Sequence, residues 1–547
     1  MAVNKEFTLP FSNIKGIESG SKTTLKEIMK KSVENNAVEI IPEYFNKTYF
    51  HWIDNLRDWC ISRQIWYGHR IPVWYCLHCK NTEVHTKEDR TLFILRHGFT
   101  DYNKQKILQG SIEIQLNDEG HEQERKEGEK LKNQNIKFII ASDLTRAKET
   151  AEIIQKITGG EIFTTDKLRE KSFGDIEGVH VEEAKIKYPE INLYEGKAPN
   201  GESYKETEER VFAELEKIIE NHSGNLVIVS HGAVMRTMIR RIKNIDPKLI
   251  MEIEKIGNCE ILPIDIMKNP CSKCKNNFFE QDEDTLDTWF SSGLWTFSTL
   301  GWPEETEDLK TFHPTHVLET GYEILFFWVA RMILMSGYAL GTVPFKTVYL
   351  HGTVRDAKGQ KMSKSLGNGI DPLEIADKYG ADAGRMALIY GTAPGTDSRI
   401  SEDKIKGYKH FANKLWNITR FVLENTKDET IDKNHSSFSD KDLDLKKEQE
   451  EFIKEITKEI ESYMFHTASE KIYSYTWHRL ADQILEESKI VFEKGTDAEK
   501  KSRKQFLLQS LENILTVLHP FMPFITEEIW QTLGKEKLLM VEKWPKI

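Results

Sequence analysis

Apolar and polar positions divide this chain into a mixed α/β part and a helical part. Up to about residue 400, short apolar runs alternate with stretches of helical periodicity, which is typical of parallel sheets covered by helices. From residue 402 onward glycine is rare and long amphipathic stretches such as 409–424 and 504–519 predict packed helices. Near the start, 24–35 predicts an amphipathic helix and 37–42 a short strand.

The middle of the chain, residues 85–266, has its own α/β pattern. Buried strands are predicted at TLFIL (91–95), IKFIIAS (136–142) and NLVIVS (225–230), with helical periodicity between them. Asp143 is expected to cap the helix that follows the second strand. The alternation predicts a three-layer α/β unit, whose polar residues gather where the strands end.

The bulk composition narrows the class of protein. The 547 residues predict about three or four domains, and 39% hydrophobic with 30% charged residues is ordinary for a globular protein. The formal net charge of −11 means that nucleic-acid contacts would need local basic patches. The most apolar stretch, 318–340, contains Glu319, Glu323 and Arg331, so we expect a buried helix and no membrane span. Because the first residues also lack the apolar core of a secretion signal, the expected compartment is the cytoplasm.

Four of the six cysteines form two C-x-x-C pairs, Cys76 with Cys79 and Cys271 with Cys274. One such pair can be redox-active, but two pairs predict four thiolates around one tetrahedral Zn²⁺ ion. The 191 residues between Cys79 and Cys271 exceed any ribbon loop. We therefore expect a whole domain with close termini to be inserted in a zinc ribbon.

Several short motifs mark the strand ends of the inserted segment. They are Arg96-His97-Gly98, Arg146 in DLTRAKETAEII, Glu170 in LREKSFGDIEG, and His231 in SHGA. A lone R-H-G or S-H-G is most often a loop histidine, but the ordered set resembles the histidine phosphatase (phosphoglycerate mutase-like) family over the whole insertion.

That resemblance implies a phosphoryl-transfer site. His97 would be the nucleophile, Glu170 the proton donor to the leaving group, and Arg96, Arg146 and His231 would hold the phosphate oxygens. The resemblance also places Asn103 and Gln109 as further pocket contacts. The sequence does not name the substrate, and Phe99 and Tyr102 stand where mutases often carry other residues, which argues against mutase activity.

A glycine-flanked lysine loop lies at 351–372, HGTVRDAKGQKMSKSLGNGIDP. A bare K-x-x-K is usually a solvated loop, whereas lysines on flexible stems also suit phosphate chains. The full KMSKS string with an upstream HG pair resembles the class I aminoacyl-tRNA synthetases. The resemblance implies a site for ATP with Mg²⁺, formed by Lys361, Ser363, Lys364, His351, Gly352 and Gly321.

Two aromatic blocks narrow the resemblance to one group of class I synthetases. The spacing in 52–76 favours core packing over base stacking, and this block resembles the return from the editing insertion of valyl-tRNA synthetases. DTWFSSGLW followed by STLGWP, within 284–303, resembles the same group. The resemblance implies that Trp289, Ile324 and Trp328 line the pocket for the valine side chain. Such a pocket selects by size and cannot sharply reject an isosteric hydroxyl.

Class I catalysis also needs a His-x-Gly-His string, which is absent from these residues. Most of the editing domain is absent too, so the chain resembles the C-terminal portion of a valyl-tRNA synthetase. The implied partners are valine, tRNA(Val) and an N-terminal fragment carrying His-x-Gly-His and the editing domain. The expected domains are a synthetase segment with half of the zinc ribbon (1–84), the phosphatase-like insertion (85–266), the other ribbon half with the remaining catalytic domain (267–400), and a helical anticodon-binding domain (401–547).

Three hypotheses remain open from the sequence. The first is a component of a valine–tRNA ligase. The second is a phosphatase carried on a tRNA-binding scaffold. The third is a non-catalytic tRNA-binding protein in which both sites are idle.

Overall fold

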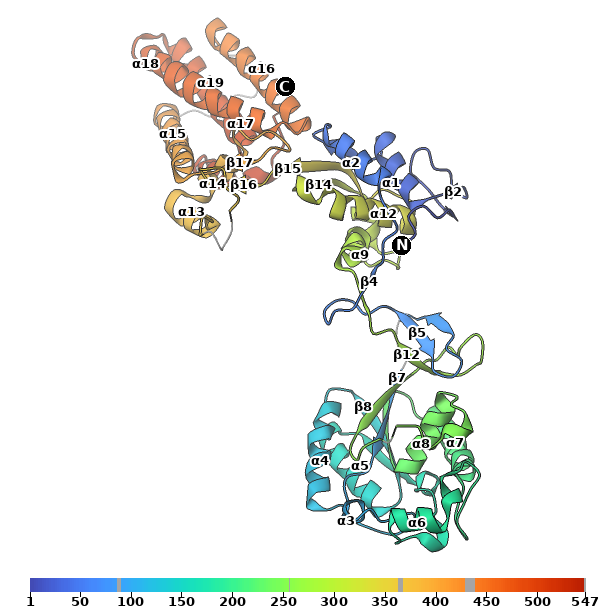
Figure 1. Cartoon of the computed structure of the whole chain (residues 1–547). Helices are drawn as coiled ribbons and strands as arrows, with labels where there is room; N and C mark the ends of the chain where they lie inside the picture. The colour runs from blue at the N-terminus through green and yellow to red at the C-terminus, as the bar shows by residue number, and fades with distance from the viewer. Residues whose placement is uncertain (86–89, 255, 363–366, 428–437, 546–547) are drawn as a thin grey trace. The chain divides into compact units, whose positions relative to one another are not determined.

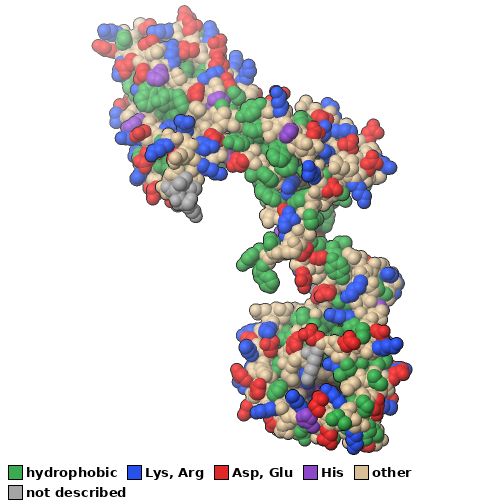
Figure 2. Space-filling view, viewed as in Figure 1, with side chains coloured by type: hydrophobic (Ala, Val, Ile, Leu, Met, Phe, Trp, Pro, Cys, Tyr) green, Lys and Arg blue, Asp and Glu red, His purple; other side chains and the backbone are tan. Residues whose placement is uncertain are grey.

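The structure is a computed structural model that describes residues 1–85, 90–254, 256–362, 367–427 and 438–545. It divides into two compact units (Figure 1), one formed by Met1–Ile61 with Thr288–Ile547 and the other by Ser62–Asp287. Figure 2 shows acidic and basic side chains interspersed over the visible face of each unit. A mixed surface of this kind leaves any polyanion contact to local groups of basic residues.

The Ser62–Asp287 unit is built on one eight-stranded sheet. Four strands are parallel, and the others continue the sheet in antiparallel pairs. The ribbon strands therefore extend the sheet of the insertion, which the sequence did not predict. In spatial order the strands are β6 (Thr82–Val84), β5 (Val73–Cys76), β12 (Phe278–Gln281), β11 (Ile261–Ile266), β7 (Arg90–Arg96), β10 (Asn225–Ser230), β8 (Ile136–Ser142) and β9 (Glu161–Thr165).

Helices cover both faces of the parallel strands. Along β7, Leu92 and Ile94 pack into one core, whereas Phe93 and Leu95 pack into another. This two-sided burial is what a parallel sheet requires, and it confirms the three-layer prediction. The helices of this unit are α3 (Asp101–Lys104), α4 (Asp118–Gly128), α5 (Thr145–Thr158), α6 (Val181–Lys187), α7 (Tyr204–Asn221) and α8 (Gly232–Ile242), several of them labelled in Figure 1.

The predicted cap of α5 is wrong. Leu144 is the N-cap residue and makes no side-chain cap bond. Asp143 instead accepts two hydrogen bonds from the guanidinium of Arg169, both at 2.6 Å. A bidentate guanidinium satisfies the carboxylate better than a single helix amide, and this pair lowers the pKa of Asp143.

The other unit contains a three-stranded parallel sheet in the order β14 (Thr315–Gly321), β15 (Phe345–His351) and β3 (Glu39–Ile41). The predicted helix near the start is α1 (Leu25–Glu34), and the predicted strand is β3. Shorter elements of this unit are β1 (Phe7–Thr8), β2 (Lys22–Thr23), α2 (Phe45–Asp54), α9 (Thr288–Gly293), α10 (Trp295–Ser298), α11 (Glu307–Phe312), β16 (Val354–Arg355) and β17 (Ser398–Arg399).

The apolar stretch that follows β14 is helical. Among the described residues, Tyr322–Leu340 is long and apolar enough to cross a membrane by length and composition. Half of it is buried, and α12 (Ala330–Leu340) contributes Ile333 and Met335 to the core beside the three-stranded sheet. The burial agrees with the predicted core helix.

The C-terminal part is a bundle with one continuous apolar core. The polar, charged stretch 428–444 is typical of a loop or a frayed helix end; 428–437 lie outside the described residues, and a helix begins at Asp440, capped by Ser439. Pro523 opens the last long helix. The elements are α13 (Pro372–Tyr379), α14 (Ala381–Ile389), α15 (Glu402–Thr426), α16 (Asp440–Glu461), α17 (Phe465–Ser474), η9 (Tyr475–Ile484), α18 (Leu485–Lys494), α19 (Asp497–Leu518) and α20 (Pro523–Thr532).

Candidate active site and metal centre

The two predicted histidines of the insertion follow neighbouring parallel strands. In the register of β7 and β10, Arg96 pairs with Ser230, so His97 and His231 leave the sheet side by side. Their ring centroids are 5.1 Å apart, and both side chains are buried. The fold thus brings together two residues that are 134 positions apart in the sequence.

The hydrogen bond of His97 fixes its tautomer. Its Nδ1 lies 2.8 Å from the carbonyl oxygen of Gly98. A carbonyl oxygen only accepts, so Nδ1 carries the proton and Nε2 keeps its lone pair. Burial, followed by the nearby charges of Arg146 and Arg96, holds the pKa of His97 well below 6.5. His97 is therefore a neutral imidazole with a free nucleophilic nitrogen at neutral pH.

Two guanidinium groups flank this histidine. Arg96 donates from Nη1 to the carbonyl of Ile256 at 3.0 Å, and Arg146 donates to the carbonyls of Ile112 and Gly110 at 2.9 and 2.8 Å. Burial lowers the pKa of Arg146 to about 10, which leaves it charged at neutral pH.

Several buried polar atoms around His97 have no hydrogen-bond partner among the described residues. They include Nε of Arg96, Nε of Arg146 and both ring nitrogens of His231. Buried donors without acceptors are rare because each costs free energy, so such a cluster indicates a ligand that accepts hydrogen bonds. A tetrahedral oxyanion fits this set of donors.

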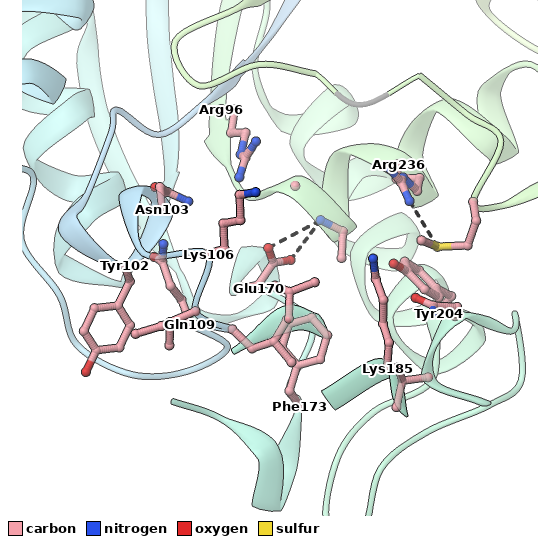
Figure 3. Close-up of a pocket in the computed structure, with 18 of the residues that line it drawn as sticks. Arg96, Tyr102, Asn103, Lys106, Gln109, Glu170, Phe173, Lys185, Tyr204 and Arg236 are labelled. Atoms are coloured by element: carbon pink, nitrogen blue, oxygen red, sulfur yellow. Dashed lines mark hydrogen bonds between the residues drawn. The ribbon is translucent and has the colours of Figure 1, made fainter. Parts of the chain in front are cut away.

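Glu170 is held at the start of α8, the helix that follows His231. Its Oε1 accepts from the amide of Ala233 at 3.1 Å (Figure 3). The same oxygen accepts from the amide of Lys171 at 2.9 Å. The next residue, Lys171, is buried, donates to the carbonyl of Ile191 at 3.0 Å and lies 4.3 Å from the ring centroid of Tyr204. Burial lowers the pKa of Lys171 to about 8.

These groups open into a cavity of about 480 Å³ (Figure 3). The structure brings six of the predicted residues to its wall: Arg96, His97, Asn103, Gln109, Arg146 and Glu170. His231 lies beside His97, behind this lining. The lining residues that were not predicted include Lys106, Lys185, Tyr204 and Arg236, which lie far apart in sequence and carry no motif. Phe173, also at the wall, lies within the LREKSFGDIEG stretch but was not singled out.

A small network fixes the loop after His97. The side-chain oxygen of Asn103 accepts from the amide of Thr100 at 3.2 Å, and Gln109 donates to the hydroxyl of Thr100 at 2.8 Å. Asn258, which the sequence did not indicate, donates to the carbonyl of His97 at 2.9 Å and lies 3.3 Å from the side-chain oxygen of Asn103.

The four predicted metal ligands converge in the ribbon. The Sγ atoms of Cys76 and Cys274 are 3.5 Å apart, those of Cys79 and Cys271 are 3.6 Å apart, and all four lie within 4.8 Å of one another. Tetrahedral zinc with Zn–S bonds of about 2.3 Å places sulfurs about 3.8 Å apart. The cluster fits a structural Zn²⁺ ion.

The two cysteine turns have matching backbones. Lys80 and Lys275 have φ values of 58° and 64°, and their amides donate to the carbonyls of Cys76 and Cys271 at 2.9 Å. Each turn aims its two thiolates inward in the same way. This repeated geometry is what a four-thiolate site needs.

The predicted nucleotide residues of the other unit lie at the carboxyl ends of its sheet. Gly321 and His351 are register partners across β14 and β15, and Nε2 of His351 lies 3.2 Å from a carboxylate oxygen of Glu319. A side chain at Gly352 would meet the backbone of Thr396, since its Cβ would lie 2.1 Å from that carbonyl oxygen.

Part of the lysine loop is also described. Lys361 forms a β-bridge with Arg355. The other two predicted loop residues, Ser363 and Lys364, lie outside the described residues.

The predicted amino-acid pocket lies where α9 meets the helical turns after β14. Trp289, Ile324 and Trp328 are all half-buried. The ring of Trp289 lies 5.9 Å from that of Phe327, and Nε1 of Trp328 donates to the carbonyl of Ser292 at 3.3 Å. The indole hydrogen bond holds the ring of Trp328 in place, and the contact with Phe327 packs the ring of Trp289.

The aromatic block at 52–76 is only partly in a core. Trp74 is buried in the ribbon, but Trp66 and Tyr67 are 93% and 83% exposed. The prediction of core packing is therefore wrong for these two residues, which lie outside the paired strands.

Three family profiles match the chain. "tRNA synthetases class I (I, L, M and V)" matches 20–133 and 234–401, "Histidine phosphatase superfamily (branch 1)" matches 92–273, and "Anticodon-binding domain of tRNA ligase" matches 442–547.

Similar proteins agree with the synthetase profile. The valine–tRNA ligases of Aquifex aeolicus and Clostridium tetani are each 33% identical to this chain over 527 residues, covering 93% and 95% of it. The chain spans only 38% and 40% of the length of these two relatives. Among solved structures, a mycobacterial glucosyl-3-phosphoglycerate phosphatase is 24% identical, covers 32% of this chain and 92% of its own, and has a TM-score of 0.31.

The synthetase profile covers just over half of the chain, in two blocks that overlap the two ends of the histidine phosphatase match. The chain therefore belongs to the class I tRNA synthetases of the isoleucine, leucine, methionine and valine group, with an inserted histidine phosphatase domain.

Proposed function

We propose that this chain is a component of a valine–tRNA ligase, which activates valine with ATP and transfers it to tRNA(Val). The observation that carries the proposal is the 33% identity to valine–tRNA ligases over 527 residues. The His-x-Gly-His string is absent from the 547 residues. The proposal includes a partner segment that carries this string and the editing domain. We propose that this ligase activity takes place in the cytoplasm.

Each predicted residue has a role in this proposal. Trp289, Ile324 and Trp328 receive the valine side chain, and the helical domain binds the tRNA. The same proposal divides the chain after residue 84, where the insertion begins, after 266, where the catalytic domain resumes, and after 400, where the helical domain begins. The ATP phosphates and their Mg²⁺ ion lie against Lys361, Ser363, Lys364, His351, Gly352 and Gly321.

Valine-dependent exchange of pyrophosphate into ATP tests the ligase role. We expect exchange only when the chain is mixed with a fragment that carries His-x-Gly-His. Exchange by the chain alone, or none in the mixture, would contradict the proposal. Leucine and isoleucine serve as the control amino acids, because a pocket for valine excludes side chains that are larger by one methylene.

We further propose that the insertion hydrolyses phosphomonoesters through a phosphohistidine. The tautomer of His97 supports this role, because Nε2 is free to attack. Nε2 would form the N–P bond while the P–O bond to the leaving group breaks, and protonated Glu170 would give its proton to the departing oxygen. Water would then attack phosphorus, Glu170 would take the proton, and the N–P bond would break to release phosphate. Arg96, Arg146 and His231 would stabilise the charge of the transferring group.

Hydrolysis of p-nitrophenyl phosphate tests the second role. We expect activity that His97→Ala abolishes and that His121→Ala, on α4 outside the cavity, leaves unchanged. An acid-labile phosphoryl adduct should accumulate on the unaltered chain and be absent from His97→Ala. If the unaltered chain were inactive in both assays, the non-catalytic tRNA-binding hypothesis would be favoured.

A further inference from the structure

The cavity around His97 carries more positive charge than one phosphoryl group needs. Five cationic side chains line it against two carboxylates, those of Glu170 and Glu182. Arg96 and Arg146 lie deep, beside His97, and suffice for the transferring phosphate. The other three cations line the rest of the cavity: Lys106, Lys185 and Arg236.

Two of these three cations lack a carboxylate partner among the described residues. Lys185 pairs with Glu182 at 2.9 Å. Arg236 lies 3.1 Å from the thioether sulfur of Met251 (Figure 3), which is a weak acceptor, and it also hydrogen-bonds the hydroxyl of Tyr204, a second neutral group. No ion pair or side-chain hydrogen bond of Lys106 occurs in the part of the chain that the structure describes. A protein cavity with unpaired cations favours an anionic ligand.

The backbone at Lys106 is fixed in an unusual conformation. Its φ is 53°, in the left-handed region that residues with side chains rarely adopt. Its amide donates to the carbonyl of Asn103 at 3.2 Å, and its carbonyl accepts from Val181 at 2.9 Å. The start of the side chain is therefore held between α3 and α6, at the cavity.

Aromatic side chains form the walls between the cations. Tyr102, Phe173 and Tyr204 line the cavity, and Figure 3 shows Lys106 and Arg236 on opposite sides of Glu170. The site therefore has one deep group of anion donors, an aromatic wall and a second group of cations.

We propose, resting on the proposed phosphatase function, that the substrate is a small organic phosphomonoester with a second anionic group. Arg236 holds this second group, and Lys106, across Glu170 from it, adds positive charge to the same cavity. A guanidinium binds a carboxylate or a phosphate through two parallel hydrogen bonds, so either group fits.

Matched substrate pairs test the proposal on the full chain. One pair is 3-phosphoglycerate and glycerol 3-phosphate, which differ by a carboxylate. The other is fructose 1,6-bisphosphate and fructose 6-phosphate, which differ by a phosphate. We expect kcat/KM to be at least about tenfold higher for the member with the second anion in one pair or both, and the pair that responds identifies the anion.

Variants locate the second anion site. Arg236→Ala should reduce the preference for the diacid about tenfold, Lys106→Ala should reduce it less, and Arg236→Lys should retain part of it. Lys104→Ala is the matched control, because Lys104 is exposed on α3 and does not line the cavity. Should Arg236→Ala fail to fold, Arg236→Lys and Lys106→Ala still report the preference.

The outcomes separate this inference from the function on which it rests. Hydrolysis that depends on His97 but shows no preference within either pair would overturn the inference and leave the phosphatase function standing. A preference that survives Arg236→Ala and Lys106→Ala would overturn the assignment of the cations. No hydrolysis of any phosphomonoester would overturn the phosphatase function, and the inference with it.

Discussion

The side-chain amide of Asn258 donates to the backbone carbonyl of His97 at an N···O distance of 2.9 Å. The next amide, that of Cys259, donates to the carbonyl of Arg96 at 3.1 Å, and Arg96 donates to Ile256 at 3.0 Å. The segment that leads into β11 thus holds both His97, the proposed nucleophile, and Arg96, which is proposed to bind phosphate. Asn258 is a positioning residue, since it acts on the site through the backbone of His97.

Asn258→Ala should lower kcat for p-nitrophenyl phosphate about tenfold and change KM little. The loss of one buried hydrogen bond costs about 1 kcal/mol, and a misplaced nucleophile affects the chemical step more than binding. Asn221→Ala, at the exposed end of α7, should change neither constant. Equal losses in kcat and in thermal stability, with an increase in KM, would mean that Asn258 only supports the fold.

The four thiolates should bind about one zinc ion per chain, and Cys271→Ser should abolish binding. Because β12, β11 and β7 belong to one sheet, loss of zinc should also lower the melting temperature of the Ser62–Asp287 unit and its phosphatase activity. Metal analysis and calorimetry measure the two effects. Cys60→Ser is the matched control, since Cys60 lies outside the cluster. Full activity in a zinc-free Cys271→Ser protein would show that the ribbon and the site are independent.

The sequence indicated which residues come together at the cavity, but it did not indicate the segment before β11 that holds them. His97 and His231 could be found because each directly follows an unbroken apolar run, and such runs form adjacent parallel strands. β11 could not be found from its pattern, since Pro263 interrupts it, and proline usually marks an edge. On β11, only Asp265 and Ile266 pair with β12, so Pro263 needs no donor on that side.

Asn258 carried no signal for a similar reason. It lies 161 positions from His97, and an asparagine in a loop usually caps a turn. Only the antiparallel pairing of β11 with β7 brings it to the nucleophile. The helix start at Asp440 could not be fixed from the sequence, because an acidic first turn is also typical of a loop or a frayed helix end, and the buried partner of Asp442, Arg503, lies 61 positions away.

Glu124→Gln should stabilise the Ser62–Asp287 unit at alkaline pH. Glu124 is fully buried on α4, and burial raises its pKa from 4.5 to about 8. A carboxyl group with a raised pKa favours the folded state below pH 4.5, and this contribution is lost as the pH rises through about 8. The neutral amide removes that loss, so the melting temperature at pH 9 should rise by roughly a few degrees.

Glu122→Gln, an exposed change on the same helix, should leave the pH dependence of the melting temperature unchanged. The melting temperatures of the two variants are compared at pH 6, where the carboxyl group of Glu124 is mostly protonated, and at pH 9, where it is mostly ionised. An equal shift at both values would assign the effect of Glu124→Gln to packing.

The helical bundle should depend strongly on one buried ion pair. Nε of Arg503 on α19 lies 2.6 Å from Oδ1 of Asp442 on α16, and both side chains are almost fully buried. Ser488 accepts a further hydrogen bond from Arg503 at 3.0 Å. Asp442→Ala leaves the guanidinium buried without its charge partner, which should cost about 3–5 kcal/mol. Asp444→Ala removes an exposed pair with Lys447 and should cost at most about 1 kcal/mol.

Calorimetry on the full chain, which resolves separate unfolding transitions, measures the difference between the two variants. The double variant Asp442→Leu with Arg503→Met should recover most of the loss, because an apolar pair of similar volume avoids the desolvation of two charges. If Asp442→Ala were no more destabilising than Asp444→Ala, the pair would contribute nothing beyond a surface contact. Failure of the double variant to recover would mean that the hydrogen bond to Ser488, and not the charge pairing alone, holds α18 against α19.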